Sequence, residues 1–171
     1  MPKYVALLRA VNVGGTGKLP MTELKAMCET AGFSHVQTYI ASGNVVFASD
    51  LPPKKVKSDL ESRLLAYAGK PIGVLVRTGP EMAAILKANP FPKRAPNATV
   101  AIFLDAPPPA DALAHAVGIR DEEMALGKRE IYVHYGAGMG TSKLRIPAAK
   151  TGTARNMNTI AKLSEMAAMI S

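Results

Sequence analysis

The chain has 171 residues, of which 48% are apolar and 20% are charged. This composition is typical of a soluble globular protein and excludes disordered, collagen-like and disulfide-rich proteins. No apolar segment approaches the roughly 20 residues that span a membrane, because Arg9 and Asn12 interrupt the hydrophobic start. We therefore expect a cytoplasmic protein without a membrane segment or a signal peptide.

The charge balance is basic. There are 21 Lys and Arg residues against 13 Asp and Glu, which gives a net charge of +8. The segment 137–164 contains lysines and arginines but no acidic residue. Such a charge favours an anionic partner, and it also serves solubility alone.

The first 78 residues predict the order β-α-β-β-α-β. A short β-rich apolar run opens the chain, and Pro20 and Gly32 bound the first helix. Ser42, Gly43 and Asn44 form the turn of a predicted hairpin. The predicted elements are strand 3–8, helix 20–31, strands 36–40 and 45–48, helix 53–67 and strand 72–77. This is the ferredoxin-like arrangement of an antiparallel sheet under two helices.

A proline-rich segment separates the two halves. A helix is predicted from Gly79 to about Asn89, and the linker 89–98 then contains three prolines, which disfavour regular structure. Beyond it we predict a strand at 99–104, a helix from Pro107 to about Val117, strands near Met124 and at 131–135, and then helical segments. The fold class is therefore α+β, with two ferredoxin-like (βαββα) units of mostly antiparallel sheets, over residues 1–88 and 99–171.

Seven ordered segments resemble the bacterial family catalogued as domain of unknown function 1697. They are Tyr4-Val-Ala-Leu-Leu-Arg9, Asn12-Val-Gly-Gly15, Lys18-Leu-Pro-Met21, Thr38 to Phe47, Asn89-Pro-Phe91, Ser142-Lys-Leu144 and Arg155 to Thr159. The resemblance covers nearly the whole chain and implies an α+β fold, but no established activity. Two positions depart from the pattern: Ala10 stands where a glycine is expected, and Met157 where a tryptophan is expected.

The glycine-rich loop at 12–18 is a candidate anion site. Glycines expose backbone N–H groups before a helix, and Lys18 adds a positive charge. The spacing does not match a Walker A motif, because Asn12 stands at the first glycine position and Leu19 at the hydroxyl position. The loop is thus either a looser anion site, through Asn12, Gly14, Gly15 and Lys18, or a structural turn.

Arg9 ends an otherwise apolar strand. An unpaired guanidinium would be costly there, so Arg9 either reaches the rim of the sheet or finds a partner. Ser42 and Asn44 in the hairpin turn are further candidates for ligand contact. The structural alternative is that the turn residues only accommodate left-handed backbone geometry.

The second half offers five more candidate ligand-binding residues. Ser142 and Lys143 follow a glycine-rich stretch at a predicted helix start, where a lysine opposes the helix dipole unless an anion lies nearby. Arg155, Asn156 and Asn158 precede the last helix, and they offer more polar groups than a helix cap requires. The alternative is that Ser142 and one of the asparagines are only caps.

Other chemistry finds little support in the sequence. The three histidines are too far apart for a local metal motif, and Cys28 falls on the apolar stripe of its helix. We predict no catalytic residue, no metal and no cofactor. A binding protein and an enzyme are both compatible with these residues.

We therefore expect a small phosphorylated or otherwise anionic ligand to bind in a basic cleft between the two units. The first alternative is a protein that binds nucleic acid weakly, since the topology offers an analogy to RNA-recognition sheets. The second is an oligomeric structural module without a ligand.

Overall fold

The computed structural model describes residues 1–10, 18–136 and 139–170. The chain divides into two compact units, of which unit 1 comprises Met1–Ala83 and Lys162–Ser171 and unit 2 comprises Ala84–Ala161. The last helix, α4 (Met157–Ala168), thus contributes residues to both units. The domain boundaries predicted from the sequence stay a prediction.

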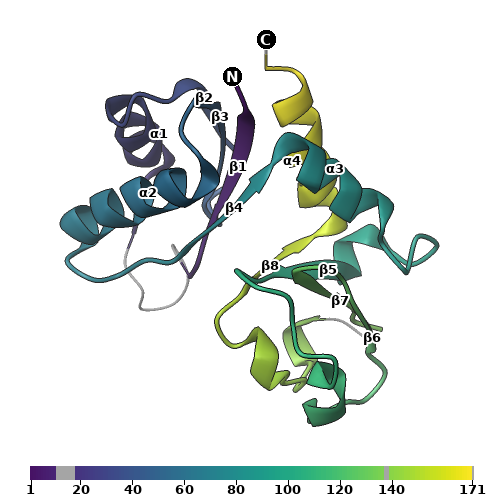
Figure 1. Ribbon diagram of the computed structural model, residues 1–171. Helices are drawn as coiled ribbons and strands as arrows, with labels where there is room; N and C mark the ends of the chain where they lie inside the picture. The colour runs from purple at the N-terminus through teal and green to yellow at the C-terminus, as the bar shows by residue number, and fades with distance from the viewer. Residues whose placement is uncertain (11–17, 137–138, 171) are drawn as a thin grey trace. The chain divides into compact units, whose positions relative to one another are not determined.

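Unit 1 is built on a four-stranded antiparallel sheet (Figure 1). The strand order is β2-β3-β1-β4, so the first strand lies in the interior of the sheet between β3 and β4. The elements are β1 (Lys3–Leu8), α1 (Met21–Thr30), β2 (Ser34–Thr38), β3 (Asn44–Ala48), α2 (Pro53–Ala68), β4 (Val74–Thr78) and the beginning of α3 (Gly79–Lys87). The predicted order of elements over residues 1–78 is confirmed.

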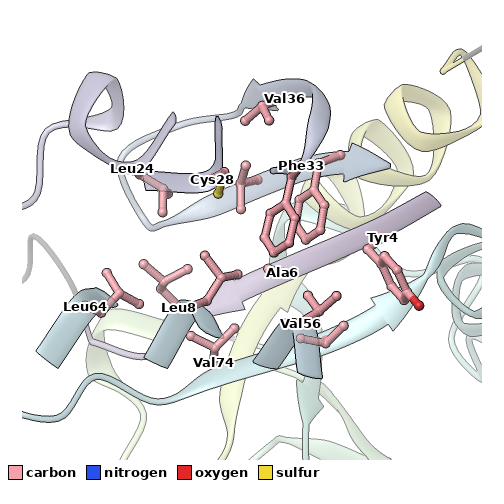
Figure 2. Packing of buried hydrophobic residues seen from close by; sticks show 14 of the residues in the cluster. Tyr4, Ala6, Leu8, Leu24, Cys28, Phe33, Val36, Val56, Leu64 and Val74 are labelled. Carbon is pink, nitrogen blue, oxygen red and sulfur yellow. The ribbon is translucent and has the colours of Figure 1, made fainter. Parts of the chain in front are cut away.

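Helices α1 and α2 cover one face of this sheet (Figure 1). Alternating residues of β1, such as Tyr4, Ala6 and Leu8, face the helices because successive side chains in a strand point to opposite faces. Phe47 stacks on Phe33 with ring centroids 4.3 Å apart. Cys28 lies in the same cluster, as its place on the helical stripe predicted (Figure 2).

The opposite face of the sheet is also buried and is more polar. It contains Val5, Leu7 and Leu75 together with Asn44 and Arg77. Arg77 is only 1% exposed and is the largest of the fully buried side chains. A strand whose two faces are both buried carries a near-continuous apolar run, as β1 does.

Unit 2 contains a second four-stranded antiparallel sheet with the order β6-β7-β5-β8. Its strands are β5 (Thr99–Phe103), β6 (Glu123–Leu126), β7 (Glu130–His134) and β8 (Thr153–Asn156). Numbered within the unit, this is the order 2-3-1-4 that unit 1 also has. The α+β class with two antiparallel sheets is therefore confirmed, and the fourth strand of unit 2 was not predicted.

Two helices predicted in the second half are absent from the part of the chain that the structure describes. The helix from Pro107 to about Val117 is only a short 3₁₀ turn, Ala112–His115, because Val117 pairs with Arg145 through two N–H···O bonds of 2.9 Å. No helix begins at Ser142 either, since Arg145 is extended and Pro147 disfavours helical geometry at the residue before it.

None of the helices in the described part of the chain is long and apolar enough to cross a membrane.

Candidate functional site

Arg9 lies immediately after the end of β1. Its backbone N–H donates to the carbonyl of Gly73 at 2.9 Å. A Cβ atom at position 73 would lie 3.2 Å from Cδ of Arg9, so the glycine leaves room for the arginine stem to pass over the backbone. The Arg9 side chain is half-buried. The apolar stem is therefore packed while the residue stays at the rim of the sheet.

The turn that precedes β3 lies beside the same end of β1. The Asn44 amide donates to the carbonyl of Tyr39 and to the hydroxyl of Ser42, both at 2.9 Å. Gly43 has a left-handed φ of 90°, and its carbonyl accepts the N–H of Leu8 at 2.9 Å. Asn44 is fully buried, whereas Ser42 is half-buried. Asn44 thus holds the turn in shape and Ser42 is the more accessible of the two.

Three of the predicted site residues of unit 1 are brought together in this way: Arg9, Ser42 and Asn44. Lys18 is exposed, and the next residue, Leu19, is buried. Asn12, Gly14 and Gly15 lie outside the described residues, so the prediction of an anion-binding loop is not addressed by the structure.

Ser142 is held by a carboxylate in unit 2. Its hydroxyl donates to Oε2 of Glu122 at 2.5 Å and accepts the N–H of Leu144 at 3.2 Å. The Ser142 hydroxyl, followed by the N–H of Arg120, lowers the pKa of Glu122. Since no helix begins here, the exposed Lys143 does not oppose a helix dipole. The reason for expecting an anion beside Lys143 is therefore removed.

Arg155 lies in β8, opposite Ala101, and is buried. Its Nη1 donates to the hydroxyl of Thr153 at 2.8 Å and to the carbonyl of Ala154 at 2.9 Å. Desolvation by burial lowers the pKa of Arg155 to about 10. Asn156, the next residue, accepts the N–H of Thr159 at 2.9 Å and caps α4. Asn158 is exposed in the first turn of that helix.

The candidates of unit 2 make hydrogen bonds to different partners. Ser142 is engaged with Glu122, Arg155 with Thr153 and its own strand, and Asn156 with α4. The convergence of these residues with those of unit 1 in one cleft stays a prediction.

Arg77 is a buried charged residue that was not among the predicted site residues. It lies opposite Val5, and its Nη1 donates to the carbonyl of Val76 at 3.0 Å. Arg155 makes the same kind of bond to its own preceding carbonyl, also on the fourth strand of its sheet. The signal was present in the sequence, because Arg77 is a charged residue near the end of an apolar strand, and Arg9 directly follows another apolar strand.

Metal and thiol chemistry find no support in the described residues. No group of three or more His, Cys, Asp or Glu side chains in that part of the chain could hold a metal ion. Burial raises the pKa of the Cys28 thiol to about 12, which keeps it protonated and unreactive at neutral pH.

Comparison with known proteins identifies the family. Residues 1–132 match the family described as "Protein of unknown function (DUF1697)". The chain belongs to this family. The sequence resemblance is thus confirmed over most of the chain, and the family description carries no activity.

One similar solved structure is a conserved bacterial protein, SP0830, from Streptococcus pneumoniae. The two chains are 24% identical with a TM-score of 0.79, and the match covers 96% of this chain and 98% of the other. At this identity the likeness shows the fold alone. Comparison with curated proteins gives no match.

Proposed function

We propose that this DUF1697 protein binds a small phosphorylated or otherwise anionic ligand, with Arg9 as the main donor. The proposal is supported by the position of Arg9 at the rim of the sheet of unit 1. Its backbone and stem are fixed on Gly73, and the turn containing Ser42 lies beside the end of β1. Binding groups held on a rigid scaffold lose little entropy when a ligand arrives.

The chemistry of the two accessible side chains suits an anion. A guanidinium offers planar donors that match phosphate and carboxylate oxygens, and a serine hydroxyl can add one more hydrogen bond. A net charge of +8 attracts such ligands at long range. A hydrogen bond to a charged group contributes about 1.5–3 kcal/mol, so the loss of Arg9 should weaken binding about tenfold or more.

The nucleic-acid alternative requires aromatic rings that are exposed for stacking on bases. Tyr4 and Phe47 are the aromatic residues that an RNA-recognition sheet would need on its open face. Both lie in the core on the helix-covered face, and the Tyr4 hydroxyl donates to the carbonyl of Leu51 at 2.7 Å. Bases cannot stack on either ring, which is why we favour a small anion.

A thermal-shift experiment tests the proposal. The probes are inorganic phosphate, pyrophosphate and ribose 5-phosphate, compared with chloride at the same ionic strength. A ligand at 100 times its Kd adds about 2.7 kcal/mol, which corresponds to a rise in Tm of roughly 5–10 °C for a chain of this size. Arg9→Gln should abolish most of the shift.

The matched control is Arg120→Gln, because Arg120 is an exposed arginine of unit 2 and its replacement changes the net charge equally. Arg120→Gln should show the same ligand-induced rise in Tm as the wild-type protein. Equal shifts for wild type and Arg9→Gln with every probe, or no shift with any of them, would refute the proposal.

A further inference from the structure

A groove of about 400 Å³ lies between β2 and the end of α4, within unit 1. His35, Gln37 and Tyr39, from β2 and the residue after it, line one side of this β2–α4 groove. Met166 and Met169 contribute to the other side, with the charged Lys162 and Glu165. The volume is in the range of small-molecule sites. The proposal for Arg9 uses none of these side chains.

Residues 162–170 belong to unit 1. Leu163, Ala167 and Ile170 of this segment are buried. A Cβ atom at Gly79, which follows β4, would lie 3.4 Å from the Cβ of Ala167, so the two backbones approach closely here. One wall of the groove is therefore formed by a segment whose apolar side chains are buried.

A β-bulge shapes the other side of the groove. Ser34 pairs with Ala48, whereas Gln37 pairs with Val46, so the register of β2 shifts by one residue between them. His35, within the bulge, has a φ of 54°, which is rare for a residue other than glycine. Val36 stays buried in the core under the helices while His35 and Gln37 both line the groove. Bulges commonly re-aim side chains in this way next to binding sites.

We propose that the β2–α4 groove binds the adenine base of a nucleoside or nucleotide. An imidazole and a phenol ring offer stacking surfaces for a base. Thioether sulfurs make favourable contacts with aromatic rings and adapt to their shape. The Gln37 carboxamide has both a donor and an acceptor, which match N7 and the N6 amino group of adenine in a bidentate pair.

The charged pair in the lining does not favour an anion by itself. Lys162 and Glu165 lie 3.6 Å apart, both are exposed, and their charges offset each other. Recognition therefore rests on the base, and ribose 5-phosphate is the ligand that should not bind here.

Calorimetric titration of the full-length protein with adenosine, guanosine and ribose 5-phosphate tests this site. Adenosine should bind saturably and more tightly than guanosine, whose O6 and N7 are both acceptors and cannot satisfy the carbonyl of Gln37. Tyr39→Ala should weaken adenosine binding about tenfold, since stacking contributes roughly 1–3 kcal/mol per base.

Three further variants test whether adenosine binds in this groove and not elsewhere on the protein. Tyr67→Ala, at an exposed tyrosine of α2, is the matched control and should leave adenosine affinity unchanged. Gln37→Ala removes an exposed side chain, so folding is spared, and it should abolish the preference for adenosine over guanosine. Arg9→Gln should not alter adenosine affinity. A loss of adenosine binding and a loss of anion binding can therefore be told apart.

Absence of saturable adenosine binding up to about 1 mM would overturn the inference. Equal losses in Tyr39→Ala and Tyr67→Ala, or an unchanged base preference in Gln37→Ala, would overturn it too. So would saturable binding of a short extended peptide along β2 in place of adenosine.

Discussion

Ala10 shows the effect of a single departure from the family pattern. The resemblance calls for glycine at this position, directly after Arg9. The backbone of Ala10 has a φ of 49°, in the left-handed region where a Cβ atom costs roughly 1–2 kcal/mol. The missing glycine is therefore a real conformational penalty beside the candidate anion site.

Ala10→Gly should stabilise the protein. Relief of the left-handed strain exceeds the entropy that glycine adds to the unfolded chain, so we expect a gain of up to about 1 kcal/mol in the free energy of unfolding. Urea denaturation measures this directly. A loss of stability in Ala10→Gly would contradict the assigned conformation.

Met157, the second departure, is 3% exposed. In this chain the position serves packing, and methionine fills irregular core space readily.

Glu122 links stability to pH. Its folded pKa is lowered, chiefly by the Ser142 hydroxyl, so the unfolded chain binds the proton more tightly. The stability it contributes is fully present above the ordinary glutamate pKa of about 4.3 and is lost as the pH falls through the lowered folded value.

Glu122→Gln should therefore flatten the acid side of the stability profile. Denaturation midpoints of both proteins between pH 7 and acid pH measure the difference, and Glu29→Gln, at an exposed position of α1, is the control. Parallel profiles for wild type and Glu122→Gln would show that the bond to Ser142 contributes nothing.

At the level of elements, Gly118 allows two irregular segments of unit 2 to approach each other closely. Gly118 has a φ of 71°, and a Cβ atom there would lie only 2.1 Å from the carbonyl oxygen of Lys143. It adjoins Val117, which pairs with Arg145. A side chain at position 118 would therefore separate two segments that this bridge joins.

Gly118→Ala should cost about 3 kcal/mol or more, because it combines left-handed strain with a backbone clash. Gly69, the C-cap of α2, has a φ of 72° but open space around it, so Gly69→Ala should cost only about 1 kcal/mol. Gly140→Ala, with neither constraint, should be nearly neutral. Chemical denaturation of the three variants gives the ranking, and a Gly118→Ala protein as stable as Gly140→Ala would contradict the close approach.

The elements of unit 1 could be predicted because each has a local signal. Pro53 and Gly69 bound α2, and Gly43 marks the turn before β3. The segment 107–117 looked helical by composition, but its conformation depends on the pairing of Val117 with Arg145, 28 residues later. β8 was missed for the same reason, since its four residues become a strand only by pairing with β5. Long-range pairing leaves no local signal.

The candidate site was predicted to a similar extent. Arg9 was found because a charge at the end of an apolar strand needs an explanation. The hydrogen bond of Ser142 to Glu122 could not be predicted, because Glu122 is 20 residues away and nothing in the spacing links the two. The predicted roles of Asn12, Gly14 and Gly15 concern residues outside the described part of the chain.

At the level of the whole molecule, the two units share a strand order and a buried arginine on the fourth strand. Each arginine directly precedes a residue that caps the next helix: Thr78 accepts the N–H of Glu81 at 3.2 Å, and Asn156 accepts that of Thr159. The two units thus share a strand order, a buried arginine and a capping residue, whereas between the corresponding strands unit 2 has the 3₁₀ turn Ala112–His115 where unit 1 has helix α1.

The net charge of +8 predicts only weak attachment to nucleic acid. Because Tyr4 and Phe47 are buried in the core of unit 1, such binding rests on counterion release, so it should fall steeply with salt and show no sequence preference. Fluorescence anisotropy with single-stranded DNA of two sequences measures both properties. Sequence-selective binding in the nanomolar range that survives at about 0.2 M salt would make nucleic acid the main partner instead.

An amide NMR titration of the isotope-labelled protein with inorganic phosphate, at constant ionic strength, decides most directly whether the anion site exists. A site at the end of β1 predicts saturable shifts centred on Arg9, Gly43 and Gly73, and their loss in Arg9→Gln. Shifts that never saturate and that follow exposed lysines such as Lys54 and Lys55 of α2 would show phosphate meeting only a basic surface, and would contradict the proposed site.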